Sequence, residues 1–180
     1  GPSLGFIIIR RTLLRRLQPT FIGGGTVKDV AGDRFELLDG EDEHSILEPG
    51  LQNWAGIVGF GSAIRWLSKV QPMGQPPQSY EAGLAQTLFD HLREMPRVTV
   101  VNTTPSPVTS LYVDGLDAHK LAVILSEQSV LCRSGHFCCH HYLQHTRRLP
   151  PLLRVSLGLH NTPDDIDRFV TILQRVLTTL

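Results

Sequence analysis

A run rich in proline and glycine, residues 71–79, interrupts the chain near its middle and limits what the chain can fold into. Pro72, Pro76 and Pro77 lack a backbone N–H and have a fixed φ, so the run cannot lie inside a helix or a central strand. We therefore interpret residues 71–79 as a linker between a first region, residues 1–70, and a second region, residues 80–180. With 180 residues and 41% hydrophobic content, the chain can bury one sizeable core and at most a smaller flanking layer.

The second region carries helix and strand signals in turn. Leucines at helical spacing predict a helix that ends before Pro96, because the residue before a proline disfavours helical geometry. Asp117 is expected to cap a second helix, and Thr162-Pro163 with a capping-box Asp165 to start a third. Short apolar runs predict strands at 98–101, 108–113, 130–133 and 152–159. This order predicts an α/β fold of the α+β kind, in which helices cover a mixed or antiparallel sheet.

The first region has weaker signals. The β-branched run at 6–9 predicts a strand buried on both faces, and a short helix is expected at 12–17. The acidic segment 31–47 is expected to form a loop or hairpin, with Asp39-Gly40 as its turn signal. At 55–70, apolar residues at helical spacing alternate with glycine, serine and alanine, which predicts a helix buried on more than one side.

Charge and cysteine content exclude several classes of function. Seventeen basic residues balance seventeen acidic ones, so neither nucleic acid nor an anionic membrane is an expected partner. The apolar run at 6–9 is too short for a membrane span or a signal peptide, and we expect a cytoplasmic protein. Cys132, Cys138 and Cys139 lie within eight residues of one another, an odd and clustered set that favours reduced thiols over disulfides.

Five motifs follow one another along the chain: Gly-Pro-Ser-Leu-Gly at 1–5, Gly-Gly-Gly at 23–25, Glu-Pro-Gly-Leu-Gln-Asn at 48–53, Arg-Ser-Gly-His-Phe-Cys at 133–138 and Arg-Val-Ser-Leu-Gly-Leu-His-Asn-Thr at 154–162. In this order they resemble the motifs of the class V aminotransferase, cysteine desulfurase-like group of pyridoxal-phosphate enzymes. Five collinear matches are far more specific than any one of them. The resemblance implies the end of the large domain of such an enzyme at 1–70 and its small C-terminal domain at 80–180.

The resemblance also implies what this chain lacks. The lysine that forms the Schiff base with pyridoxal phosphate is expected about three residues before Gly1, and Lys28, Lys69 and Lys120 stand in other contexts. The partner expected from the resemblance is therefore a missing N-terminal half that holds the cofactor. Alone, the chain is expected to bind no pyridoxal phosphate and to turn over no substrate.

The resemblance assigns residues to the chemistry of the complete enzyme. Cys138 matches the cysteine that takes sulfur from a cysteine-like substrate as a persulfide, and a nearby His136 favours its thiolate. Arg154 matches the arginine that binds the substrate carboxylate, with Asn161 and His136 also placed at the substrate. From the residues alone, an inert loop thiol at 138 and a solvent-facing arginine at 154 are equally consistent with the pattern.

The stretch 48–53 departs from the family pattern. Leu51 stands where the family has a threonine that donates its hydroxyl to the cofactor phosphate across a dimer interface. Either Gln52 or Asn53 replaces that contact, or phosphate binding is weakened.

Three functions remain open. The first is the C-terminal portion of a desulfurase or class V aminotransferase, and the second is a truncated non-catalytic domain for dimerisation or binding. A metal-binding or redox module at 132–145 is the third, but adjacent ligands seldom converge on one ion, so no metal is expected. The apolar surface left by a missing half predicts a homodimer.

Overall fold

A computed structural model describes residues 4–38 and 45–179 of the chain. They form two compact units, Gly1–Lys69 and Val70–Leu180, and each unit is described by itself. Residues 1–3 of the first motif and the expected turn at Asp39-Gly40 lie outside the described residues.

The first unit is thinly packed. Its elements are α1 (Arg11–Leu14), the hairpin strands β1 (Val27–Ala31) and β2 (Arg34–Leu37), a 3₁₀ turn (Ser45–Leu47) and α2 (Trp54–Leu67). The hairpin turns at Gly32, whose φ of 62° is easily adopted only by a residue without a side chain. Thr26 is the one fully buried residue that the described part of this unit contains.

Two expectations for this unit are wrong. Residues 6–9 belong to no strand, and Phe6, Ile7 and Ile8 are exposed, because a strand buried on both faces needs neighbours that the described residues do not supply. The helix expected at 55–70 is present as α2, yet none of its residues is buried. Its ring contact is between Phe60 and Phe6, whose centroids lie 4.9 Å apart.

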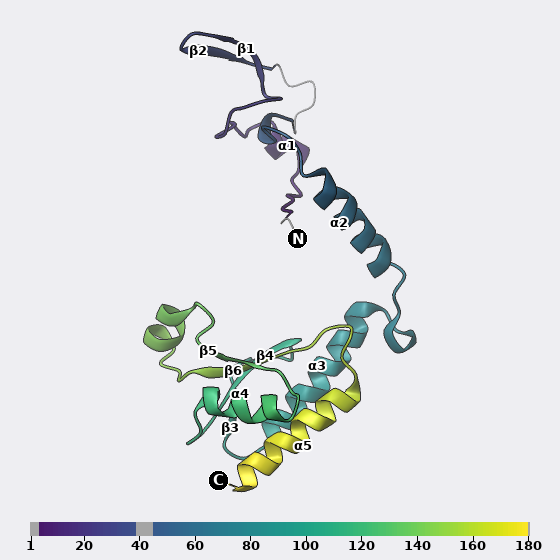
Figure 1. The fold of residues 1–180 in the computed structure, drawn as a ribbon, viewed down its shortest axis with the longest axis vertical. Coiled ribbons are helices and arrows are strands. Elements are labelled where there is room, and N and C mark those ends of the chain that lie inside the picture. The colour runs from purple at the N-terminus through teal and green to yellow at the C-terminus, as the bar shows by residue number, and fades with distance from the viewer. Residues whose placement is uncertain (1–3, 39–44, 180) are drawn as a thin grey trace. The chain divides into compact units, whose positions relative to one another are not determined.

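The second unit is a four-stranded antiparallel sheet with helices on one face (Figure 1). Its helices are α3 (Pro77–Glu94), α4 (Ala118–Glu127) and α5 (Pro163–Thr179), preceded by a 3₁₀ turn at Pro72–Gly74. The strands lie in the order β3 (Val98–Val100), β4 (Val108–Val113), β6 (Leu152–Ser156) and β5 (Arg133–Gly135). The expected fold, helices over an antiparallel sheet, is confirmed.

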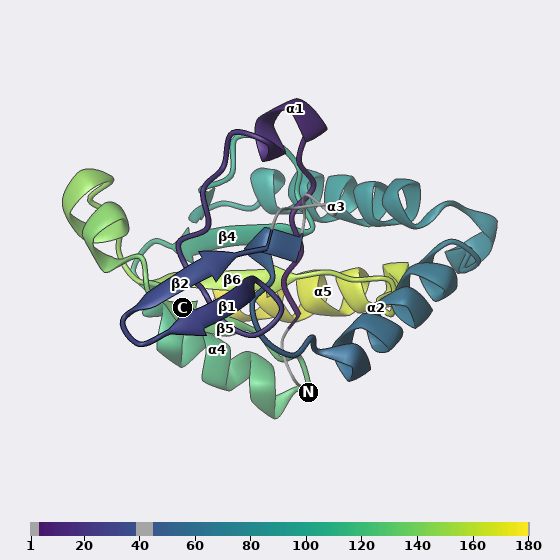
Figure 2. The same ribbon diagram turned by 90° about the horizontal axis from the view of Figure 1, so that it is seen from above.

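The core of the second unit lies between the sheet and these helices. Helix α3 packs on β3 and β4, and α4 packs on β5 and β6, while α5 packs against both helices. Figure 2 shows the second unit from above, with α5 running between α3 and α4. Leu111 and Leu153, paired across β4 and β6, are fully buried against the leucines of the helices.

The helix starts follow the sequence signals. The Oδ1 atom of Asp117 accepts hydrogen bonds from the N–H groups of His119 and Lys120, both at 3.0 Å, as an N-cap should. At α5 the carboxylate of Asp165 accepts the N–H of Thr162 at 2.9 Å, and this bond lowers the pKa of Asp165. Both caps confirm the expected helix starts.

The strand expected at 130–133 is displaced. Val130 donates its N–H to the carbonyl of Leu125, and Ser129 has a φ of 60°, so these residues close the end of α4. Strand pairing therefore begins only at Arg133. Strand β6 also differs from the expected range, because it ends at Ser156, three residues before the expected end at residue 159.

Within residues 4–38 and 45–179, no helix combines the length and the apolar character that a membrane span requires.

Candidate active site on the open face of the sheet

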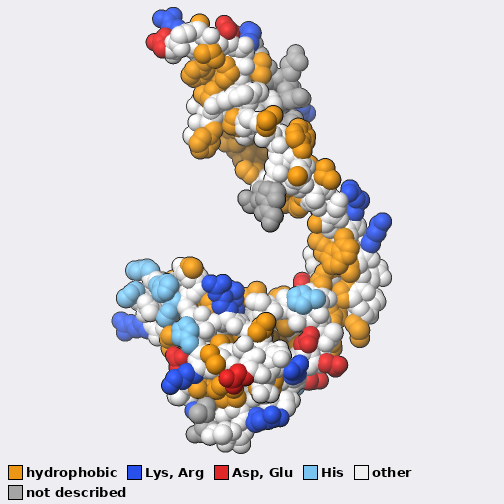
Figure 3. Space-filling model, viewed as in Figure 1, with side chains coloured by type: hydrophobic (Ala, Val, Ile, Leu, Met, Phe, Trp, Pro, Cys, Tyr) orange, Lys and Arg blue, Asp and Glu red, His pale blue; other side chains and the backbone are white. Residues whose placement is uncertain are grey.

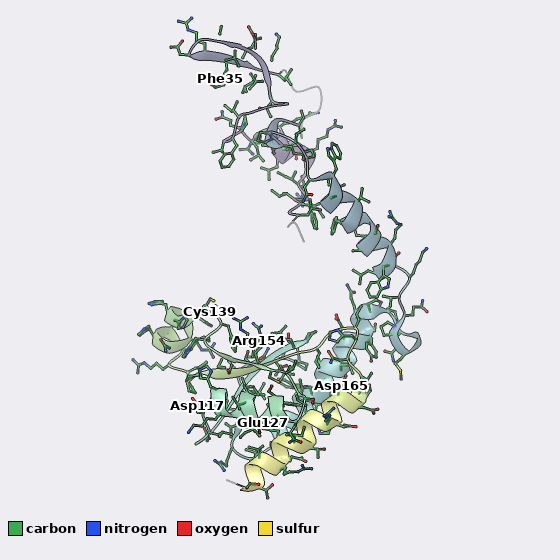
Figure 4. The ribbon with its side chains drawn as sticks, viewed as in Figure 1. Phe35, Asp117, Glu127, Cys139, Arg154 and Asp165 are labelled. Carbon is green, nitrogen blue, oxygen red and sulfur yellow. The ribbon has the colours of Figure 1, made fainter. Side chains whose placement is uncertain are left out.

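A row of polar side chains crosses the sheet of the second unit on the face opposite the helices. Strand register pairs Arg154 of β6 with Arg133 of β5 on one side and with Ser110 of β4 on the other. Leu153 and Val155, which flank Arg154, belong to the buried core, so alternation turns Arg154 to the opposite face. Figure 4 shows Arg154 on that face, away from α4 and α5.

Arg154 is half-buried, and one N–H group of its guanidinium lacks a hydrogen-bond partner among the described residues. Its Nε–H is enclosed and makes no hydrogen bond to any residue that the structure describes. Its guanidinium carbon lies 4.9 Å from the centre of the Phe137 ring, a cation–π distance. An enclosed donor without a partner costs about 1–3 kcal/mol, so the position of this arginine is unfavourable for the stability of the fold.

A second arginine adds to the positive charge at this place. Arg133 stands directly opposite Arg154 in the β5–β6 register, where like charges repel. Within residues 4–38 and 45–179, neither arginine forms a salt bridge. Two unneutralised guanidinium groups on an open sheet face attract an anion such as a carboxylate, which Arg154 can hold in a bidentate fashion.

The cysteine loop leaves β5 through an unusual turn. The carbonyl of His136 accepts the N–H of Cys139 at 2.8 Å, and both central residues, Phe137 and Cys138, have positive φ, 51° and 62°. Positive φ at both central positions is typical of a type I′ turn, which glycine and asparagine favour. Here a bulky aromatic residue and a cysteine adopt it, which is backbone strain of the kind found at functional sites.

This turn presents the expected nucleophile. Cys138 is exposed at the second central position, and exposed Cys139 follows it, two residues before the π-helix η3 (His141–Thr146). Because Phe137 contacts Arg154, the turn places Cys138 one residue from the side chain that stacks on the arginine. Figure 4 shows Cys139 and Arg154 on the same side of the sheet.

Histidines surround the cysteine loop. The Nε2 atom of His136 is enclosed and has no hydrogen-bond partner in the described part of the chain, and its ring lies 5.3 Å from that of His140. His141 and His145 form a second pair at 5.6 Å. Figure 3 shows these imidazoles gathered over the π-helix. In residues 4–38 and 45–179 no group of three or more His, Cys, Asp or Glu side chains could hold a metal ion.

Asn161 lies in the loop between β6 and α5, where its side chain shapes the backbone. Its Oδ1 accepts the N–H of Gly158 at 2.9 Å, and its Nδ2 donates to Asp165 at 3.4 Å. Its own carbonyl accepts the hydroxyl of Tyr80 on α3 at 2.6 Å. The amide is therefore engaged within the loop.

Gln52 and Asn53, expected at the cofactor phosphate, belong to the first unit. The Nε2 of Gln52 donates to the carbonyl of Glu48 at 3.1 Å, and the Oδ1 of Asn53 accepts the N–H of Gly56 at 2.9 Å as the N-cap of α2. Leu51 is fully exposed and has no polar group to offer. Each side chain is thus bonded through one amide atom to the backbone of its own segment.

Cys132 differs from the other two thiols. It packs against the core of the second unit, and burial raises its pKa to about 11. It is the core residue expected from its place in an apolar run.

Sequence reasoning missed two contributors to the site. Phe137 covers the guanidinium of Arg154, and the hydroxyl of Ser134 on β5 lies 2.9 Å from Nδ1 of His119 on α4. The second contact ties the strand that precedes the cysteine turn to the helix behind the sheet. Neither a phenylalanine in a turn nor a serine in a short strand gives a sequence signal of these contacts.

The fold agrees with that of known cysteine desulfurases, which are pyridoxal-phosphate enzymes of fold type I. The crystal structure of the cysteine desulfurase CsdA from Escherichia coli superposes with a TM-score of 0.78 at 26% identity, over 95% of this chain and 41% of that one. The apo structure of a cysteine desulfurase from Thermococcus onnurineus NA1 superposes with a TM-score of 0.80 at 25% identity, over 96% and 42%.

The family follows from the sequence itself. Residues 1–169 match the model of the aminotransferase class-V family, and the chain belongs to that family. A probable cysteine desulfurase of Haemophilus influenzae is 31% identical over 182 residues, which cover 100% of this chain and 40% of the relative. A probable cysteine desulfurase of Xylella fastidiosa is 31% identical over 180 residues. The expected family is confirmed, and the chain spans about two fifths of the length of these relatives.

Proposed function

We propose that this chain is the C-terminal portion of a cysteine desulfurase that depends on pyridoxal phosphate. It supplies the loop cysteine, Cys138, and the arginine that binds the substrate carboxylate, Arg154. The observation that carries the proposal is the guanidinium of Arg154, which forms no salt bridge within residues 4–38 and 45–179 and stacks on Phe137, one residue before an exposed cysteine. A domain with a purely structural role gains nothing from an unpaired guanidinium, whereas the two Nη groups can hold a substrate carboxylate.

The proposed roles follow from the chemistry of each side chain. Arg154 holds the carboxylate of a cysteine substrate in a bidentate fashion and so fixes the position of its sulfur. The thiolate of Cys138 then takes that sulfur as a persulfide, with alanine as the co-product. Asn161 and His136 supply further substrate contacts, Asn161 through the N–H of Nδ2 that does not bond Asp165.

We assign the cofactor to the complete enzyme. Pyridoxal phosphate serves as the electron sink for the carbon chemistry once the missing N-terminal portion holds it. Gln52 and Asn53 are the residues of this chain that we assign to its phosphate, through the N–H groups of their amides. Borohydride treatment of the chain alone with pyridoxal phosphate is expected to leave no specific adduct in a peptide map.

The proposal is tested in a chimera. The matching 182-residue segment of the Haemophilus influenzae relative is replaced by this chain, and sulfide and alanine released from L-cysteine are measured. Cys138→Ser is expected to abolish release with cofactor still bound. Arg154→Lys keeps the positive charge but loses the planar guanidinium that holds a carboxylate through two hydrogen bonds. It is expected to raise the KM for L-cysteine about 10-fold or more. Arg168→Lys, on the outside of α5, is the matched control and leaves both constants unchanged.

Two results would contradict the proposal. One is a chimera that binds cofactor and whose turnover of cysteine is the same with and without the Cys138→Ser substitution. The other is an Arg154→Lys variant with unchanged KM.

A non-catalytic domain for dimerisation or binding is the second candidate. The first unit favours it, because exposed large apolar residues are concentrated there, among them Phe21, Leu51, Trp54 and Trp66. We expect a homodimer, and a monomeric mass in light scattering at micromolar concentration would count against it. From the three reduced thiols we also infer a cytoplasmic location.

A further inference from the structure

The family resemblance gives a role to Cys138 but leaves the adjacent thiol without one. Cys139 is exposed and free, like Cys138, whereas Cys132 is half-buried with its pKa raised to about 11. The chain therefore presents two accessible, consecutive thiols in the loop where sulfur is expected to arrive.

Cys138 and Cys139 are consecutive residues in a turn that a backbone hydrogen bond closes. The hydrogen bond from the N–H of Cys139 to the carbonyl of His136 closes the turn immediately after Cys138. Consecutive α-carbons lie about 3.8 Å apart, less than the roughly 4.4–6.8 Å that disulfides normally span. A disulfide between the two residues is possible only under strain, and strained disulfides are easily reduced.

We propose that Cys139 is a resolving thiol that releases the sulfur held as a persulfide on Cys138. This step rests on the proposed function of Cys138. The thiolate of Cys139 attacks the Sγ atom of Cys138, and the bond between that Sγ and the sulfane sulfur breaks. A Cys138–Cys139 disulfide forms, and hydrosulfide leaves with the electron pair of the broken bond.

The step balances without an external oxidant. The sulfane sulfur is reduced to sulfide and the sulfur of Cys139 is oxidised, while the sulfur of Cys138 keeps the oxidation level that it has in the persulfide. Strain in the eight-membered ring makes that disulfide reactive, so a small dithiol returns both cysteines to the reduced form. The pair thus allows sulfide release without a protein that accepts the persulfide.

The test uses the full chain and sodium polysulfide as the sulfur donor, so it needs no cofactor. After excess donor is removed, the intact mass is followed with time and the modified residue is mapped. A persulfide adds about 32 Da, and a disulfide removes about 2 Da from the reduced chain. In the unsubstituted chain we expect the first species to convert into the second, with an equal amount of sulfide released. In Cys139→Ser the persulfide on Cys138 is expected to last about 10-fold longer, because the neighbouring attacking thiol is gone.

The possible results separate this inference from the proposed function. If Cys139→Ser carries a lasting persulfide on Cys138 and the unsubstituted chain carries one equally long, the resolving role is wrong and the proposed function stands. A disulfide that maps to Cys132 also overturns the resolving role. If residue 138 takes up no sulfur in either protein, the proposed nucleophile is wrong, and the resolving role falls with it. Cys138→Ser is the matched control, in which a persulfide on Cys139 is expected to persist.

Discussion

Arg154 is a residue whose position lowers the stability of the fold. Its neighbours in β6, Leu153 and Val155, are core residues, while its own Nε is enclosed without a partner in the described part of the chain. The stacking on Phe137 returns about 0.5–1 kcal/mol, less than the roughly 1–3 kcal/mol that an unsatisfied enclosed donor costs.

Arg154→Leu is therefore expected to raise the free energy of unfolding by about 1 kcal/mol, because the enclosed donor is removed. The measurement is a urea titration followed by circular dichroism. Arg168→Leu is the matched control, since the Nη2 of Arg168 donates to the carbonyl of Gln128 at 2.6 Å, and its loss is expected to destabilise by about 0.5–1.5 kcal/mol. Equal destabilisation by both substitutions would show that Arg154 serves the fold.

At the residue scale, the sequence identifies Cys138 and Arg154 but not what surrounds them. The motifs at 133–138 and 154–162 single out these side chains through their family resemblance. Phe137, which contacts the guanidinium, and His119, which contacts Ser134, depend on strand register and on the packing of α4, and neither is encoded locally.

The turn at 136–139 is the element that positions the cysteines. Both of its central residues have positive φ, which costs an L-residue with a side chain about 1–2 kcal/mol. The strain lies at the position that the proposed chemistry uses.

Cys138→Gly is expected to be more stable than Cys138→Ala by about 0.5–1 kcal/mol, because glycine adopts a φ of 62° without strain. At Cys139, whose carbonyl accepts the N–H of Leu143 in the following helical segment, the order is expected to reverse and alanine to be the more stable. Thermal unfolding of the four variants makes the comparison. The same order at both positions would mean that φ does not govern stability at residue 138.

At the element scale, local signals predict the elements that they cap and miss those that depend on neighbours. Asp117, Pro96 and the Thr162–Asp165 pair set the ends of α4, α3 and α5 as expected. The displaced β5 and the failed strand at 6–9 have other causes. Strand β5 begins late because the N–H of Val130 donates to the carbonyl of Leu125 at the end of α4. Residues 6–9 form no strand because the described residues provide no strand with which they could pair.

The whole molecule is uneven, because its buried apolar cluster lies entirely in the second unit, from Tyr80 to Leu177. In the first unit, Trp54 and Trp66 are exposed on α2, and they are the two tryptophans of the chain. Each unit can therefore be followed separately, tryptophan fluorescence reporting on the first and helical circular dichroism mainly on the second.

The segment 70–180, expressed alone, is expected to unfold cooperatively in urea at the midpoint of the full chain, because it contains the whole core. The segment 1–69 is expected to show no cooperative transition. A midpoint for 70–180 more than about 0.5 M below that of the full chain would mean that the first unit stabilises the second.

At the scale of the whole molecule, sequence reasoning gives the family and the sheet with its helices, since the motifs run along the chain in order. The exposed state of α2 could not be predicted from its own pattern. Small and apolar residues at 54–67 signal a helix that packs closely, but the surface on which it packs is not encoded in that stretch.

Cys132 offers a use unrelated to the proposed chemistry. With its pKa raised to about 11 by burial, it is almost entirely protonated and unreactive at neutral pH, while Cys138 and Cys139 stand exposed. An alkylating reagent should thus modify Cys138 and Cys139 quickly and Cys132 slowly. The three native thiols therefore report separately on the cysteine loop and on the core of the second unit, without any engineered probe.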